Sequence, residues 1–126
     1  MRALRENNGK VPGELGNVPC LIITTTGART GKKRPIPLAC HEVDGRLLII
    51  ASMGGAKHNP PWYHNLVANP EVLVEKDGET FEARAVITAG EDRDRLFASV
   101  CAALPPFAEY QARTERNIPV IELKRR

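Results

Sequence analysis

The chain has 126 residues, a net charge of +3 at pH 7 and 42% hydrophobic residues, which is the size and composition of one globular domain. It contains no run of about 18 apolar residues and no apolar N-terminal stretch, so we expect neither a membrane-spanning helix nor a secretory signal. The expected location is therefore the cytoplasm, with peripheral attachment to a membrane as the alternative. Three widely spaced cysteines (Cys20, Cys40 and Cys101) favour buried, reduced thiols over a disulfide framework.

The first half of the chain predicts three strands in an antiparallel meander. Val18–Thr26 is rich in β-branched residues and stops at Gly27, which indicates a buried strand. A basic turn leads to a second strand over 34–43. Asp44-Gly45 is the signal of a tight hairpin into a third strand over 46–52.

A short helix is expected next. Asn59 has the chemistry of an N-cap and is followed by two prolines, which predicts a helix over Pro61–Ala68. Asn69-Pro70 ends it, because the residue before a proline is pushed out of helical geometry.

The second half predicts a further hairpin, a longer helix and a final strand. The strands 71–76 and 79–88 are joined at Asp77-Gly78. Thr88 and Glu91 have the spacing of a capping box, and an apolar stripe at helical period follows until Pro105-Pro106. One or two more turns over 107–113 and a strand over 118–123 complete the chain.

Six strands arranged mostly as hairpins, with a short central helix and C-terminal helices, predict a mainly β, α+β fold built as a small antiparallel barrel. A closed or nearly closed sheet also hides its edges. We expect one domain over 18–126, preceded by an N-terminal segment over 1–17 that can be flexible.

The second strand carries the first candidate binding residue. Period-two alternation places Arg34 on the same face as Ile36, Leu38 and Cys40. Arg34 therefore either lies at the rim of the strand in water or binds an anion with its bidentate guanidinium. The preceding turn, 27–32, has two glycines, a hydroxyl and two cations, and such a turn is either simply solvated or presents N–H groups to phosphate.

Two further segments are candidates, and several classes of site find no support. The glycines of Ser52–Gly55 indicate either a flexible strand exit or close approach of a flat ligand. Trp62 begins a run of ring side chains and either packs in the core or borders a site. The histidines and cysteines lack metal-ligand spacing, and no Gly-x-Ser-x-Gly elbow or Walker loop is present. No aromatic platform accompanies the basic turn, which disfavours nucleic-acid binding.

Four ordered motifs carry a family resemblance. They are Thr24-Thr25-Thr26-Gly27-x-x-Thr30-Gly31-x-x-Arg34-x-x-Pro37-Leu38, Ala51-Ser52-x-Gly54-Gly55-Ala56, Pro61-Trp62-Tyr63-x-Asn65-Leu66-x-Ala68-Asn69-Pro70, and Tyr110-Gln111-x-x-Thr114-x-Arg116-x-Ile118-Pro119. Together they resemble the deazaflavin (coenzyme F-420)-dependent nitroreductase and quinone reductase family. That resemblance implies a split β-barrel related to the flavin mononucleotide-binding barrels.

The resemblance also implies a function and a site. The expected activity is hydride transfer from reduced F-420 to a small organic acceptor, namely a quinone, an activated alkene or a nitro compound. The alternatives are a non-catalytic F-420-binding protein and a flavin mononucleotide-dependent barrel, and a homodimer is one expected arrangement. The residues implied to contact the cofactor are Ala28, Arg29, Thr30, Lys32, Arg34, Pro35, Ile36, Pro37, Leu38, Ala39, Ile50, Ala51, Ser52, Met53, Gly54, Gly55, Pro61, Trp62, Tyr63, His64 and Asn65.

Three positions depart from the family's pattern. Ala28 removes a cation from the basic turn, and Met53 replaces a lysine that many relatives have near the ring. Phe107 stands where the nitroreductases have tyrosine, so no phenol at this position can orient or protonate an acceptor. The implied acceptor pocket consists of Phe107 and Tyr110, with Tyr110 as the remaining proton donor. These departures favour a quinone or enone over a nitro compound, and no metal is expected.

Overall fold

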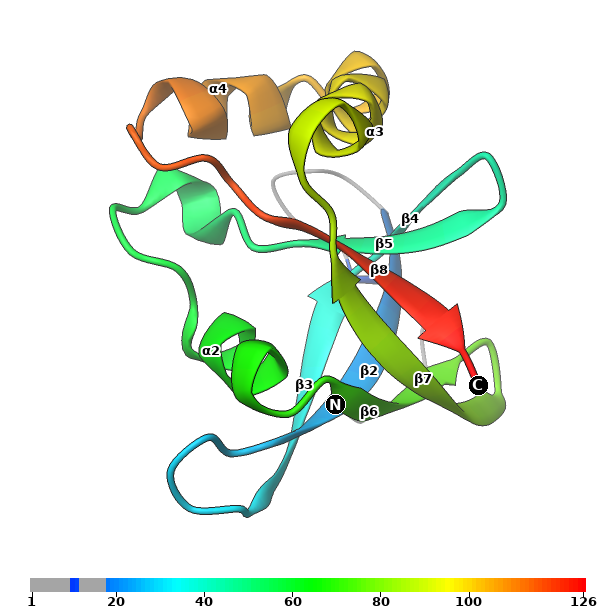
Figure 1. The fold of residues 1–126 in the computed structure, drawn as a ribbon. Coiled ribbons are helices and arrows are strands. Elements are labelled where there is room, and N and C mark those ends of the chain that lie inside the picture. Colours follow the sequence, from blue (N-terminus) through cyan, green and yellow to red (C-terminus); the bar gives the residue numbers. More distant parts are fainter. Residues whose placement is uncertain (1–9, 12–17) are drawn as a thin grey trace.

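The computed structural model describes residues 10–11 and 18–126, which form strands, three α-helices and one short 3-10 turn (Figure 1). In chain order the elements are β1 (Lys10–Val11), β2 (Val18–Thr26), β3 (Lys33–Ala39), β4 (His41–Val43), β5 (Arg46–Ile50), η1 (Met53–Gly55), α2 (Pro61–Ala68), β6 (Glu71–Lys76), β7 (Glu79–Ile87), α3 (Gly90–Ala103), α4 (Pro106–Ala112) and β8 (Val120–Arg125).

All strands belong to one antiparallel sheet that curves into a split barrel, as expected. The strand order is β1-β2-β6-β7-β8-β5-β4, and β3 pairs with β2. Residues 1–9 and 12–17 lie outside the described residues, so the expected boundary at residue 17 stays a prediction. Lys10 and Val11 pair with Pro19 and Val18 of β2.

The segment 33–43 joins the two ends of this sheet. We expected one strand over 34–43, and that prediction is wrong, because the chain changes partner at Cys40. Up to Ala39 it pairs with β2, and the Cys40 N–H still donates to Pro19 O at 2.9 Å. From His41 it pairs with β5. The bend at Cys40 therefore closes the barrel.

Both predicted tight hairpins are confirmed. Asp44 and Gly45 have φ values of 53° and 76°, and Asp77 and Gly78 have 51° and 78°. Two successive positive φ values define the type I′ turn, which matches the twist of the flanking strands.

Both predicted helix caps are wrong, although α2 has the expected bounds. Thr88 does not cap α3, because its hydroxyl donates to Val120 O at 2.7 Å, and Ala89 stands at the cap without a side-chain bond. Asn59 does not cap α2 either. Pro60 occupies that position, and Asn59 Oδ1 instead accepts from Arg116. In both cases a distant partner competes with the local one.

Strand β5 separates two hydrophobic cores. Ile49 and Ala51 point into the barrel. Leu48 and Ile50 point outward into a second core with α3 and α4, which lie together on that side of the sheet (Figure 1). The alternation follows from the two-residue period of a strand, and β5 is therefore buried on both faces.

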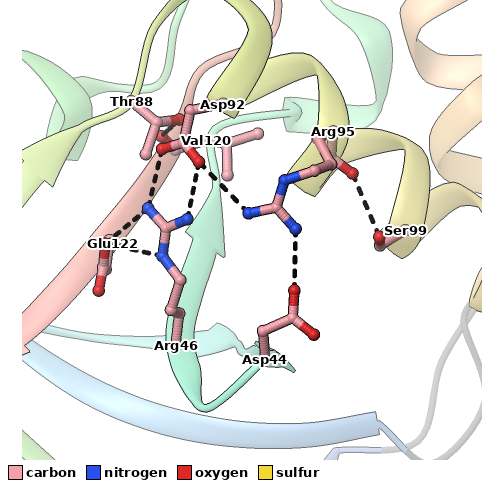
Figure 2. A network of polar contacts seen from close by, with 8 residues as sticks. All are labelled: Asp44, Arg46, Thr88, Asp92, Arg95, Ser99, Val120 and Glu122. Atoms are coloured by element: carbon pink, nitrogen blue, oxygen red, sulfur yellow. Dashed lines mark hydrogen bonds and ion pairs between the residues drawn. The ribbon is translucent and has the colours of Figure 1, made fainter.

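A polar network fixes α3 to the sheet (Figure 2). Arg46 donates two hydrogen bonds to the carboxylate of Asp92 on α3, at 2.7 and 2.8 Å, and also binds Glu122 of β8. Arg95 of α3 binds Asp44 in the β4–β5 turn at 2.8 Å. This bidentate, multi-residue arrangement gives the helix a defined position on the strands.

The cysteines are held as thiols. Cys20 and Cys40 are buried, and Cys101 is half-buried. Burial raises the pKa of the Cys40 thiol to about 12 and also raises the pKa of Cys101. Within the described residues, no helix is long and apolar enough to cross a membrane.

Candidate cofactor and acceptor site

Two hollows lie along β3. The first, which we call the basic hollow, has a volume of about 450 Å³ and lies between the turn after β2 and the start of α2. The second, the apolar hollow, has a volume of about 230 Å³ and lies between the bend at Cys40, the end of β5 and α4. Arg34 borders the first and Leu38 the second, and four residues of a strand span about 13 Å.

The segment between η1 and α2 contributes to both hollows. Asn59 and Pro61 border the basic hollow, whereas Pro60 and Trp62 border the apolar hollow. Pro60 is extended, with φ −64° and ψ 154°, so successive residues there face opposite sides. The two hollows are therefore neighbours that share one dividing segment.

The basic hollow contains seven of the residues expected to bind a cofactor: Ala28, Arg29, Thr30, Arg34, Pro61, His64 and Asn65. Asn65 positions the basic turn, since its Oδ1 accepts from the Ala28 N–H at 2.9 Å. Gly27 allows the turn to close. A Cβ at this position would lie 2.7 Å from Thr30 Oγ1 and 3.4 Å from Arg34 Nε.

The cations in and beside the basic hollow have no carboxylate partner in the described part of the chain. Arg29 and Arg34 border the hollow, Lys32 lies in the same turn outside it, and all three are exposed and form no ion pair there. Most other arginines of the fold do have such partners, for example Arg46 with Asp92 and Arg125 with Glu79. The basic hollow thus has uncompensated positive charge, which attracts anions.

The apolar hollow contains six more of the expected cofactor residues, together with Phe107. These are Leu38, Ala39, Ile50, Ser52, Met53 and Trp62. Met53 is 55% exposed and adopts a left-handed φ of 47°, which is rare outside glycine. The surfaces of Leu38, Ile50, Trp62 and Phe107 suit a flat, hydrocarbon-rich ligand.

His41 also borders the apolar hollow, although neither its spacing nor a motif marked it as a site residue. Its ring contacts Phe107 edge to face, with 5.2 Å between the centroids. Among the residues that the structure describes, its buried Nε2 has no hydrogen-bond partner. Burial lowers the pKa of His41 to about 4, so the imidazole is neutral near pH 7.

Several expected site residues border neither hollow. Ala51 is fully buried in the barrel core, and Gly55 faces α4, since a Cβ there would lie 2.6 Å from Tyr110 O. The missing Cβ of Gly55 therefore makes room for α4 and not for a ligand. The others outside both hollows are Lys32, Pro35, Ile36, Pro37 and Tyr63. The surroundings of Gly54 lie outside the described part of the structure, so its expected contact with the cofactor stays a prediction.

Tyr110 is also absent from the apolar hollow. Only 4% of its surface is exposed, and its ring packs edge to face on Phe107, with the centroids 5.6 Å apart. Phe107 thus lies between Tyr110 and the hollow's other residues, and this placement gives no support to Tyr110 as the proton donor.

Four residues that border the hollows were not among the expected site residues: Gly27, Asn59, Pro60 and His41. Gly27 belongs to the first of the four motifs, and Asn59-Pro60 precedes the third. Those two positions could have been found by extending the motifs. His41 could not, because its place depends on the bend at Cys40.

Comparisons with known proteins give one consistent family. Residues 1–124 match the model of the F420H(2)-dependent quinone reductase family. An F420H(2)-dependent quinone reductase of Mycobacterium tuberculosis is 37% identical over 126 residues, covering 97% of this chain and 85% of the relative.

Two solved structures are similar in fold and sequence. One is described as an F420-H2 dependent reductase (FDR-A), with 40% identity, a TM-score of 0.75 and coverage of 84% of this chain and 94% of the other. The second, described as a domain-swapped dimer, has 35% identity and a TM-score of 0.76, and the match covers 98% and 94% of the two chains.

Proposed function

The chain belongs to the F420H(2)-dependent quinone reductase family, and we propose that its two hollows form one groove that binds reduced F-420 beside a quinone. The main support for this proposal is that the surface changes from positively charged to apolar along β3. Uncompensated cations border one hollow, and apolar side chains border the other. F-420 has the same division, with an anionic tail of phosphate and glutamate and a flat deazaflavin ring.

The residues present fit this cofactor. Arg29 and Arg34, which are exposed and border the basic hollow, would hold the anionic tail. The missing Cβ of Gly27 makes room for the Thr30 hydroxyl and the Arg34 guanidinium in this turn. The deazaflavin would pack against Leu38, Ile50 and Trp62. When bound, reduced F-420 supplies the hydride that reduces the quinone.

The chain's own residues hold the reactants in place. Phe107 and Trp62 border the apolar hollow without offering a nucleophile, so their role is packing. Two-electron reduction leaves negative charge on a quinone oxygen, which bulk water can protonate. The mechanism therefore requires no acidic side chain in the hollow.

Titration with F-420 and with flavin mononucleotide tests this proposal. Binding of F-420 quenches or shifts its own fluorescence, and its reduced form should then be oxidised when menadione is added. Tight binding of flavin mononucleotide without binding of F-420 would overturn the cofactor assignment. Binding of F-420 without reduction of any quinone would indicate a non-catalytic F-420-binding protein instead of an enzyme.

Arg34→Ala should weaken F-420 binding far more than it weakens the fold. Arg34 is exposed and has no carboxylate partner in the described residues, so its removal exposes no buried charge. Loss of a charge-assisted contact should cost about 1.5 to 3 kcal/mol of binding free energy, roughly 10- to 100-fold in Kd. The measurement is fluorescence titration. Lys124→Ala on β8, which removes a cation outside the basic hollow, is the control variant. Equal affinities of the Arg34 variant and wild type would show that Arg34 only borders the hollow.

Phe107→Tyr should shift acceptor preference toward nitro compounds. Phe107 is 3% exposed and borders the apolar hollow, and a phenol there adds a proton donor beside the acceptor. The native chain should reduce menadione faster than a bicyclic nitroimidazole, and the variant should narrow that ratio. The ratio is measured by following oxidation of reduced F-420 with each acceptor. An unchanged ratio would mean that residue 107 does not select the acceptor.

A homodimer is part of the proposal. Its support is the 35% identical relative whose structure is described as a domain-swapped dimer. Light scattering of the purified protein tests it, and a monomer at all concentrations would contradict it.

A further inference from the structure

We propose that Arg116 is a positioning residue that fixes the two hollows relative to each other, so that a single ligand can occupy both at once. This inference rests on the proposed function, because it concerns a ligand with a ring in one hollow and a tail in the other. Arg116 itself borders neither hollow.

The guanidinium of Arg116 binds four acceptors on one segment, 51–59. Nη2 donates to Ser52 O at 2.6 Å, and Nη1 donates to Ala51 O at 2.9 Å and to Asn59 Oδ1 at 2.8 Å. Nε donates to Ala56 O at 2.8 Å. All three guanidinium nitrogens are therefore used, and the acceptors lie at both ends of the segment.

The acceptors include one residue from each hollow. Ser52 borders the apolar hollow, and Asn59 borders the basic hollow. A single side chain from the approach to β8 thus holds both sides of the groove. The distance between these sides depends on the conformation of the segment that Arg116 binds.

That segment has little regular structure of its own. After Ala51, whose N–H donates to Pro119 O, the backbone bonds found in its described residues are internal, such as Gly55 N to Ser52 O. Met53 adopts a left-handed backbone conformation, which is unfavourable for any residue that has a Cβ atom. An unfavourable conformation persists only where its surroundings enforce it, and here Arg116 binds the carbonyl just before Met53.

The planar shape of the side chain matters here, and not only its charge. All four acceptors are neutral, and Arg116 has no carboxylate partner within the described residues. Partial burial lowers the pKa of Arg116, but the group remains a cation at pH 7. Lysine would keep the charge, yet its single ammonium nitrogen cannot reach four acceptors that are spread around the edge of the planar guanidinium.

A ligand in both hollows should depend on this arrangement more than a ligand in one. The affinity gained by linking two contacts falls when the geometry no longer allows both at once. F-420 has both parts, and the tail-less deazaflavin has only the ring. Loss of Arg116 should therefore reduce the advantage of F-420 over its tail-less analogue.

The test is fluorescence titration of wild type, Arg116→Lys and Arg116→Gln with both ligands. Both variants should lower the ratio of the two affinities roughly 10-fold or more, while the tail-less deazaflavin binds nearly as in wild type. Arg95→Lys, an exposed arginine paired with Asp44, is the control and should leave both affinities unchanged. Thermal melts establish that each variant is folded.

Asn59→Ala is the milder variant if loss of Arg116 prevents folding. It removes one acceptor and should shift the ratio in the same direction by a smaller factor. Equal losses for both ligands would show a merely structural role, and full rescue by lysine would show that charge alone matters. Either result overturns the inference. If wild type binds F-420 no better than the tail-less deazaflavin, the proposed groove itself is wrong, whatever the variants do.

Discussion

Gly55→Ala should destabilise the protein by about 2 to 5 kcal/mol. Gly55 has a φ of 84° and packs against α4, where an added Cβ would lie 2.6 Å from Tyr110 O and 3.0 Å from Arg113 Cβ. The left-handed conformation should cost about 1 to 2 kcal/mol for alanine. Overpacking against backbone atoms should add roughly 1 to 3 kcal/mol. Chemical denaturation measures the loss.

Gly45→Ala is the matched control. Gly45 has a similar φ of 76°, but no atom of the described residues lies within 4 Å of its added Cβ. It should therefore lose only the conformational part, about 1 to 2 kcal/mol. If both variants lose the same stability, the contact between Gly55 and α4 is not tight. A displaced α4 would also move Phe107 and should weaken cofactor binding in the Gly55 variant alone.

Acidification from pH 6.5 to pH 4 should destabilise the native chain through His41 by up to about 3 kcal/mol. Burial lowers the pKa of His41 to about 4 from 6.5, so between these values the unfolded chain binds a proton that the folded chain does not. Stability therefore rises with pH across this window and is lost as pH falls. Each unit of pKa difference corresponds to about 1.4 kcal/mol.

The measurement is the free energy of unfolding in urea at several pH values for native chain and His41→Leu. The difference between the two should change across the window, because the variant lacks the titrating group. Carboxylates contribute equally to both chains and cancel. His58→Leu removes an exposed histidine and should keep the native pH dependence. Parallel curves for native chain and His41→Leu would contradict the expected burial effect.

Most of the fold could be predicted from local sequence signals. The β-branched run of β2, the two Asp-Gly turns and the prolines around α2 each act within a few residues of themselves. The failures involve distant partners. Cys40 is a bend because its neighbours pair with different strands, and Thr88 binds Val120 on β8 instead of capping α3.

The site was predictable to a similar extent and for the same reason. The basic turn and the start of α2 belong to contiguous motifs, and the structure brings them together around Asn65. His41 borders the apolar hollow because the chain bends at Cys40. Tyr110 was expected there, but Phe107 lies between it and the hollow. Neither outcome follows from residue type or spacing. The role of Arg116 depends on four acceptors more than 50 positions earlier in the chain.

The protonated state of the thiols has a chemical consequence for a quinone reductase. Quinones are Michael acceptors, and they alkylate thiolates much faster than thiols. With the pKa of Cys40 near 12 and that of Cys101 raised, almost no thiolate forms at either position at neutral pH. Burial of Cys20 and Cys40 also keeps electrophiles from reaching their sulfur atoms. We therefore expect slow alkylation of these thiols by a quinone acceptor.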